Sequence, residues 1–447
     1  MDNIRKKLTI LLSLIPLLFM LFSGLNLLGT DLTYNFLPSL SIQFHIHIDS
    51  LALLFLYLVN ILIPITLSAT TLQSRAFYSL VLLLQWLLIG FFTAYDLVFF
   101  TFFFEAMLLP LYFVITIWGG ENRQAAAFKF LIYMIAGSVF MIAALLGLFI
   151  HAHTFNLAEL IPFAAKAPYA ELICGAFLLA FAVKTPLFPF HAWLPDTYCQ
   201  APTSGTILLS AILSKAGIYG IIRINLALFP KIMTLWSPLL LALAIAGVLY
   251  GAFAAWSQTD FKRLIAYSSL SHINFVLAGL FVWNEIAQSG AILQALNHSV
   301  TITGLFLVSG WLELRLQNTA MGQVHGLAKY LPTLCWITLF FVLSSVALPG
   351  LNNFIGEVMV LLGIFIHTPW YAAILALTVI FSVLYMLRFM QSLYFETPSA
   401  FQQSWIDLGR REILVALPLI GLILWLGIYP APVLKQIDTA IPMEKTS

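Results

Sequence analysis

The sequence contains very little charge. Only 9% of its 447 residues are Asp, Glu, Lys or Arg, whereas 62% are hydrophobic. The mean hydropathy is +0.99. Such a chain cannot expose enough polar surface to water, so the composition indicates a polytopic membrane protein. The net charge of +2 is too small for the basic surface that nucleic acid requires, which argues against nucleic acid as a partner.

The sequence also contains few cysteines. Cys174, Cys199 and Cys335 lie far apart and form no CxxC pair, which argues against an iron–sulfur, haem or zinc site held by this chain. No glycine-rich phosphate loop follows a strand signal, so a nucleotide site is not expected either. The segment His45–Asp49 resembles a metal cluster on paper, but Asp49 followed by Ser50 is a typical helix N-cap. We therefore predict no metal and no cofactor in this chain.

Long apolar runs dominate what the sequence does contain. They predict an all-α membrane protein whose whole length, residues 1–447, forms one membrane-embedded domain with about thirteen spans. The spans are expected near 8–28, 50–70, 76–95, 97–118, 125–150, 168–190, 201–228, 234–256, 262–282, 287–312, 330–366, 371–393 and 412–430. Eleven loop Lys and Arg residues on one side against four on the other predict an N-terminus inside and a C-terminus outside.

Two of the spans are interrupted. The run near 168–190 continues into a segment broken by Pro186, Pro189 and Pro195, and the sequence ALPGLNNFIGE breaks the run near 330–366. Paired interruptions of this kind are typical of transporters built from inverted repeats. We expect N-terminal helices in 1–70, a first repeat in 76–228, a second in 234–393, and a C-terminal helix and tail in 412–447.

Three ionisable residues lie deep within the predicted spans, namely Glu105, Lys184 and Lys215. A charged group at the centre of a membrane helix costs about 2.5–3.5 kcal/mol, and such groups are usually functional. These three residues could form structural ion pairs, which is the simpler interpretation, or they could bind and release protons, which is the more specific one. Lysine favours the proton site because its pKa falls readily on burial, which lets it release and recapture a proton.

Three further titratable residues follow in the second half of the chain. His272 lies in a helix rich in hydroxyls and amides, a setting that favours proton relay over the usual structural role of a buried histidine. His298 could be either a relay or a satisfied core residue. Glu357 follows the second interruption, where it could cap the restarting helix as well as exchange protons.

Five motif-bearing segments are spread over residues 102–432 of the chain. They are FFFEAMLLPLYFVITIWGG with FKFLIYMIAGS after it, VKTPLFPFHAWLPDTYCQAPTSGTILLSAILSKAGIYG, QTDFKRLIAYSSLSHINFVLAG, ALPGLNNFIGE and DLGRREILVALPLIGLILWLGIYPAP. Together they resemble the proton-pumping, antiporter-like membrane subunits of respiratory complex I. Glu357 favours the M-type branch, because the L- and N-type branches and the cation/proton antiporter subunits typically carry Lys there.

The resemblance implies two inverted five-helix repeats and a hydrophilic axis along the centre of the membrane. It implies catalytic roles for six residues, with Glu105 as the family's essential glutamate, Lys184 as its paired lysine and Lys215 as the central lysine. His272 and His298 match the connecting histidines, and Glu357 matches the terminal acid. Members usually carry one span more, before the IDGLSLL-type motif that reads here as Ile48–Leu51. The sequence NHSVTITGLF also departs from the family pattern around His298.

The resemblance further implies partners, location and activity. L-type and N-type neighbours, the lateral helix of the L-type subunit and lipids are the expected partners, in a bacterial inner membrane. FMN, iron–sulfur clusters and quinone are expected in other subunits of a proton-translocating NADH:quinone oxidoreductase. Two alternatives stay open, namely a membrane subunit of a cation/proton antiporter or hydrogenase-type complex, and a purely structural spacer. A spacer has no reason to bear the desolvation cost of four buried charges.

Overall fold

The computed structural model describes residues 2–322, 324–397 and 405–440. Within this part of the chain, eleven helices are long and apolar enough to cross a membrane. The two other expected spans are the interrupted ones, which the structure resolves as α8 (Ala170–Lys184) followed by α9 (Trp193–Gln200), and as α15 (Pro332–Ser345) followed by α16 (Asn352–His367). The prediction of an all-α polytopic membrane protein is therefore confirmed.

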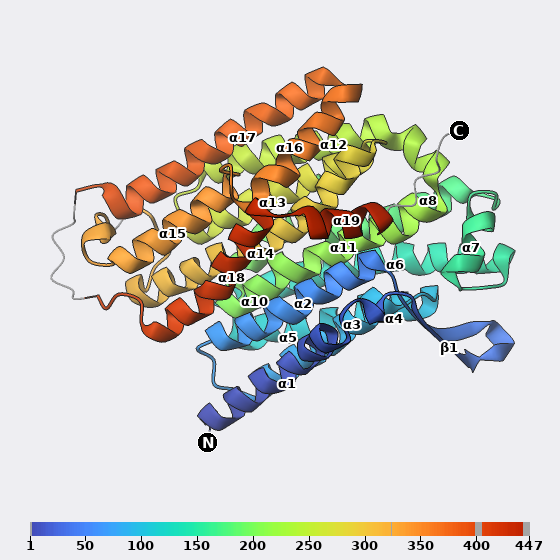
Figure 1. Ribbon diagram of the computed structural model, residues 1–447, viewed down its shortest axis with the longest axis horizontal. Helices are drawn as coiled ribbons and strands as arrows, with labels where there is room; N and C mark the ends of the chain where they lie inside the picture. Colours follow the sequence, from blue (N-terminus) through green and yellow to red (C-terminus); the bar gives the residue numbers. More distant parts are fainter. Residues whose placement is uncertain (1, 323, 398–404, 441–447) are drawn as a thin grey trace.

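The helices pack side by side as one elongated bundle (Figure 1). The remaining helices are α1 (Asp2–Ser23), α2 (Ser50–Ala69), α3 (Arg75–Thr93), α4 (Leu97–Ala106), α5 (Leu108–Trp118), α6 (Arg123–Ala152), α7 (Leu157–Ala164), α10 (Thr203–Ile207), α11 (Ser214–Gly220), α12 (Pro230–Ser257), α13 (Phe261–Phe281), α14 (Glu285–Leu316), α17 (Pro369–Met390), α18 (Arg410–Ile428) and α19 (Ala431–Ala440). Short 3₁₀ segments lie at Gly24–Leu27, Pro38–Leu40 and Leu327–Lys329, and π segments at Leu208–Leu213, Ile221–Leu226 and Gln391–Phe395.

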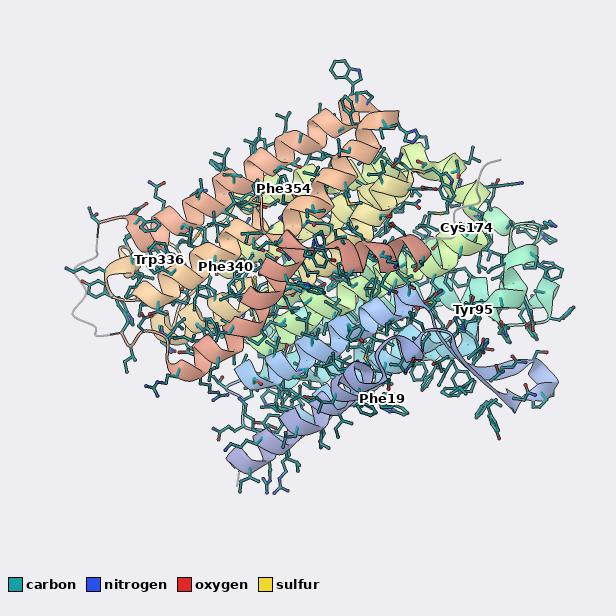
Figure 2. The ribbon with its side chains drawn as sticks, in the orientation of Figure 1. Phe19, Tyr95, Cys174, Trp336, Phe340 and Phe354 are labelled. Carbon is teal, nitrogen blue, oxygen red and sulfur yellow. The ribbon has the colours of Figure 1, made fainter. Side chains whose placement is uncertain are left out.

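The middle of the bundle is formed by the span of α10 and α11, by α13 and by α14, which are buried along almost their whole length. Helices α1, α6 and α18 lie at the periphery and expose large apolar side chains (Figure 2). Phe19 on α1 and Trp336 on α15 are 60% and 71% exposed, respectively. An apolar exterior is what a helix bundle presents to lipid, whereas the polar side chains gather inside.

A β-hairpin between α1 and α2 was not predicted. Strands β1 (Thr30–Leu37) and β2 (Ile42–Ile48) pair antiparallel with Thr30 opposite Ile48. The hairpin projects from one end of the bundle (Figure 1), and Ile46 forms an isolated bridge to Ala94 in the turn between α3 and α4. We call this end of the bundle the hairpin end, and the opposite end the N-terminal end.

Three features of the structure differ from the predicted spans. Helix α1 ends at Ser23 rather than near 28 because the 3₁₀ turn Gly24–Leu27 follows it. The span near 97–118 is divided at Met107 into α4 and α5. The C-terminal tail contains α19, a short helix that packs on α2 and α14. The expected cap is present, because the Asp49 carboxylate accepts the Ala52 N–H at 2.9 Å and begins α2.

Two loop pairings at opposite ends of the bundle follow the same pattern. At the hairpin end, Leu97 N–H donates to Phe155 and Leu157 N–H donates to Tyr95. At the N-terminal end, Phe261 N–H donates to the carbonyl of Thr319, and Met321 N–H donates to the carbonyl of Thr259. Each of these four residues lies 164 positions after its counterpart at the hairpin end, so that Phe261 corresponds to Leu97. Asp96 and Asp260, also 164 positions apart, cap the helices that follow, α4 and α13.

Candidate functional site

Four of the six predicted site residues meet in the buried centre of the bundle. Lys215 Nζ on α11 lies 2.8 Å from His298 Nδ1 on α14. The ring centroids of His298 and His272 are 5.7 Å apart. His272 Nδ1 on α13 lies 3.3 Å from Glu357 Oε1 on α16. The four side chains form a row of titratable groups that joins the first half of the chain to the second.

Lys215 owes its position to irregular helix geometry. The π segment Leu208–Leu213 precedes α11 and the π segment Ile221–Leu226 follows it. Lys215 Nζ donates to the backbone carbonyl of Ser210 at 2.8 Å, and Ser214 Oγ donates to the same carbonyl. Single π turns inside helices occur frequently at functional sites, because they turn one side chain and release carbonyl groups from regular pairing.

Glu357 sits on the helix that restarts after the second interruption. Gly350, with a backbone φ of +93°, lies within this break, where a left-handed conformation suits glycine. The Glu357 side chain accepts a hydrogen bond from Gln294 Nε2 at 3.1 Å. Its carboxylate is thus held between an amide on α14 and an imidazole on α13, two ligands that can each stabilise a buried charge.

Glu105 lies on α4 and Lys184 on α8, which packs against the helix α11 that carries Lys215. Lys184 is the last residue of α8, where the first interruption begins. Its ammonium donates to the Phe104 carbonyl at 2.5 Å and lies 3.1 Å from the centroid of the Phe104 ring. Glu105, the next residue, accepts a hydrogen bond from Ser138 on α6. Lys184 therefore contacts the residue next to Glu105 in the chain, and each of the two side chains has a hydrogen-bond partner of its own.

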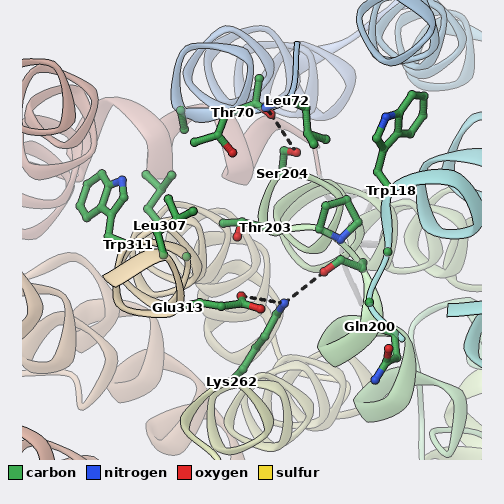
Figure 3. Close-up of a pocket in the computed structure, with 18 of the residues that line it drawn as sticks. Thr70, Leu72, Trp118, Gln200, Thr203, Ser204, Lys262, Leu307, Trp311 and Glu313 are labelled. Atoms are coloured by element: carbon green, nitrogen blue, oxygen red, sulfur yellow. Dashed lines mark hydrogen bonds and ion pairs between the residues drawn. The ribbon is translucent and has the colours of Figure 1, made fainter. Parts of the chain in front are cut away.

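A polar pocket of about 340 Å³ opens at the N-terminal end, between α2, α5, α10, α13 and α14 (Figure 3). Lys262 reaches into it and lies 3.3 Å from Glu313 and 3.1 Å from the carbonyl of Ala201. Thr70 and Ser204 face each other at 3.4 Å on the opposite wall. Charged and hydroxyl groups thus surround an open cavity at this end of the bundle.

The hairpin brings together one cluster that could hold a metal, Asp31 with His45 and His47. Burial raises the pKa of Asp31, but the hydrogen bond and charge of His45, with those of His47, outweigh it and hold the pKa below its usual value. Asn156 uses its carbonyl to cap α7, so its amide faces His45 Nδ1 at 3.2 Å. His45 Nε2 lies 2.7 Å from Asp31 Oδ1.

Sequence reasoning missed Gln294 and Ser138. Gln294, Asn297, His298 and Thr301 stand at positions i, i+3, i+4 and i+7, which places them on one face of α14. That polar stripe within a buried helix was the available signal for Gln294. Ser138 carries no comparable signal, because its hydroxyl matters only once α6 is packed against α4.

Comparison with known proteins defines the class. The family described as NADH:quinone oxidoreductase/Mrp antiporter, transmembrane, matches residues 94–385. This stretch is more than half of the chain, and the chain belongs to that family. The resemblance indicated by the sequence motifs is confirmed.

Particular members are similar over most of their length. The NADH-quinone oxidoreductase subunit M of Rickettsia prowazekii (strain Madrid E) is 36% identical over 415 residues, which cover 91% of this chain and 84% of that protein. Subunit M of Pseudomonas aeruginosa is 39% identical over 414 residues, covering 88% and 81%. A chain in the structure of respiratory complex I from Thermus thermophilus with bound NADH matches with a TM-score of 0.92 and 32% identity, covering 98% of this chain and 94% of that one.

Proposed function

We propose that this chain is the M-type, proton-translocating membrane subunit of an NADH:quinone oxidoreductase. The observation that carries the proposal is the buried row from Lys215 through His298 and His272 to Glu357. Four titratable groups enclosed in a membrane bundle bear a large desolvation cost. Their close spacing suits proton transfer, and the family supplies the context of a redox-driven pump.

The proposed route has two parts. The Glu105–Lys184 pair modulates the input site, and Lys215 stores the proton at the centre. His298 and His272 then relay it to Glu357, which passes it toward the outer side. Among the described residues, Nε2 of each histidine has no hydrogen-bond partner. The same is true of the side-chain carbonyl of Gln294 and of both side-chain amide atoms of Asn353. Buried polar atoms require partners, so these atoms are where water would complete the relay.

The energies are of adequate size for such a switch. Moving one charge against 100 mV requires about 2.3 kcal/mol. Separating a buried ion pair changes the free energy by several kcal/mol. A movement that shifts Lys184 between the Phe104 carbonyl and the Glu105 carboxylate therefore involves enough energy to drive a proton onward.

The proposed repeats are residues 76–228 and 234–393, flanked by N-terminal helices in 1–70 and a C-terminal segment in 412–447. The matched loop pairings 164 positions apart support this division, because they join equivalent loops at opposite ends of the bundle. Equivalent elements at opposite ends are what an inverted repeat requires. In each unit the interrupted span is the fourth of five.

The proposed assembly is the membrane arm of the complex, in a bacterial inner membrane with the N-terminal end inside. L-type and N-type subunits would be the neighbours, together with the lateral helix of the L-type subunit. FMN, iron–sulfur clusters and quinone would belong to other subunits. An ion-exchanging complex without a redox partner is the competing function, and Glu357, where antiporter subunits typically carry Lys, favours the oxidoreductase.

The decisive experiment replaces Lys184 by Ala in the assembled complex. NADH oxidation by quinone and proton uptake are measured together in inverted membrane vesicles, with Lys166→Ala in an exposed loop as the matched control. We expect Lys184→Ala to abolish pumping-linked activity while Lys166→Ala pumps normally. Full pumping by Lys184→Ala would overturn the pair mechanism.

Companion subunits test the assignment itself. The native complex is purified and its subunits are identified by mass spectrometry, with NADH:quinone activity assayed alongside. Flavin and iron–sulfur subunits are expected to co-purify. If only other antiporter-like membrane subunits are found, the chain belongs to an ion exchanger.

A further inference from the structure

An open groove of about 550 Å³ lies at the N-terminal end between α1, α2 and α18. Its walls are apolar apart from the hydroxyl of Ser68. They are formed by Ile10, Leu14, Pro64, Ile65, Ser68, Leu414, Val415 and Pro418. Its mouth is lined by Lys6, Lys7 and Arg411. None of these residues belongs to the buried row of titratable groups.

The mouth of this groove concentrates positive charge. Lys6 and Arg411 both donate to the carbonyl of Thr70, the C-cap of α2, and Arg411 also donates to the carbonyl of Ser68 at 2.7 Å. Lys7 is exposed beside them. Among the residues whose side chains the structure describes, these three form no ion pair with an acid. The negative end of a helix dipole is equivalent to about half a charge, which leaves most of the positive charge uncompensated.

The shape of the groove fits a lipid. On α1 its lining runs from Lys6 to Leu14, and on α18 from Arg411 to Pro418. At 1.5 Å per residue the groove reaches about 10 Å inward from its basic mouth, roughly a third of the hydrocarbon core. A spanning helix from another subunit would need a contact surface along the full thickness of the membrane. A phospholipid instead places its phosphate at the mouth and only its upper acyl chain in the groove.

We propose that this groove is a binding site for one anionic phospholipid. Its phosphate accepts hydrogen bonds from Lys6, Lys7 and Arg411, and its acyl chain lies against Pro64 and Pro418. Basic pockets between transmembrane helices on the inner side of a membrane favour this class of lipid. The site shares no residue with the buried row of titratable groups, and it ties α1 and α18 to α2 through a shared ligand.

Photo-crosslinking in the native membrane tests the site. A benzoylphenylalanine replaces Leu414, which is 65% exposed and lines the groove, and in the control it replaces Leu424, which is exposed on the same helix outside it. Adducts are identified by mass spectrometry. We expect phospholipid adducts at both positions, with anionic lipids enriched at Leu414 relative to Leu424.

Charge removal completes the test. Each basic residue near a membrane surface changes the affinity for anionic lipid about fivefold, so Lys6→Gln, Lys7→Gln and Arg411→Gln together reduce it about a hundredfold. Lys7→Gln alone removes no hydrogen bond within the protein and keeps the test valid if the triple variant does not fold. Arg410→Gln, exposed outside the groove, leaves the enrichment unchanged. Equal anionic fractions at both positions, or a polypeptide adduct at Leu414, would overturn the proposal.

Discussion

The side-chain nitrogen of Lys215 lies 2.8 Å from Nδ1 of His298, although 83 positions of sequence separate the two residues. An ammonium group at this distance donates to the imidazole, and after one proton transfer the imidazolium donates to the amine. The same contact therefore serves both protonation states. It also crosses from the helix that carries Lys215 to the long buried helix α14, and so links the two halves of the chain.

This contact makes Lys215→Arg informative. A guanidinium keeps the positive charge but does not release its proton at any physiological pH. We expect Lys215→Arg to lose proton pumping as completely as Lys215→Ala, measured in inverted vesicles with assembly checked by subunit composition. Pumping by the Arg variant would mean that Lys215 supplies only a fixed charge. Lys166→Arg, in an exposed loop, is the matched control.

Close packing at Gly217 gives a second prediction. A Cβ at this position would lie 2.0 Å from Thr185 Oγ1 and 2.9 Å from the carbonyl of Phe181, at the end of the interrupted helix α8. Gly217→Ala must displace that break, and we expect lower thermal stability and reduced pumping. At Gly421 on α18 a Cβ meets nothing within 4 Å. Gly421→Ala should be neutral or stabilise by up to about 1 kcal/mol. Equal behaviour of the two variants would contradict this packing.

Gln294 is expected to position Glu357. Gln294→Leu removes a hydrogen bond to a buried carboxylate, an interaction worth about 1.5–3 kcal/mol, which corresponds to a tenfold or greater loss of pumping. The control is Gln288→Leu, which lies on the same helix but donates to the carbonyl of Leu280. If the two variants pump equally, the amide of Gln294 has no part in holding the acid. The proton-pumping rate and its pH profile are the measurements.

Asp407 provides a pH-dependent contribution to stability. Its carboxylate accepts the N–H groups of Thr333 and Leu334 at 2.7 and 3.1 Å and so caps α15. Burial raises the pKa of Asp407, but these donors and the Leu408 N–H outweigh it and hold the pKa below 3.8. Removing the cap in Asp407→Ala should cost about 1 kcal/mol.

The sign of this pH dependence follows from the lowered pKa. The unfolded state binds the proton more readily, so the stabilisation is fully present above about pH 4 and is lost as the pH falls through the folded-state value. Thermal unfolding curves of wild type and Asp407→Ala should therefore differ by a constant amount between pH 7 and pH 5, and converge below about pH 4. Asp407→Asn, which keeps an acceptor, should lie between them.

Much of this architecture could be predicted from the sequence because the bilayer restricts the choices. A run of about twenty apolar residues has almost one possible structure in lipid, and proline and glycine marked both interruptions. The rarity of intramembrane charge identified Lys184, Lys215 and Glu357 as residues worth following. What those residues do in the mechanism stays a prediction.

The remainder depended on contacts between distant segments. Strand β1, TDLTYNFL, is short and mostly exposed, so its pairing with β2 is set by the turn and by the neighbouring loops rather than by a strong pattern. The π segments around Lys215 have no sequence signature, because a π turn uses ordinary helix-forming residues. The Lys184 contact with the Phe104 carbonyl joins residues 80 positions apart, so no local sequence pattern specifies it. The division of α4 from α5 at Met107 does have a local signal, because Pro110 in the first turn of α5 has no N–H to bond with the preceding turn.

The seven residues of α11, which include Lys215, form a short α-helix between two underwound π segments. Each π segment stores one residue more than an α-helical turn would hold. Closing the first π segment and widening the second would advance α11 by one residue and turn it about 100°, the angle of one residue in a helix with 3.6 residues per turn. Such a rotation would move the Lys215 amine away from His298 while both ends of the span keep their positions.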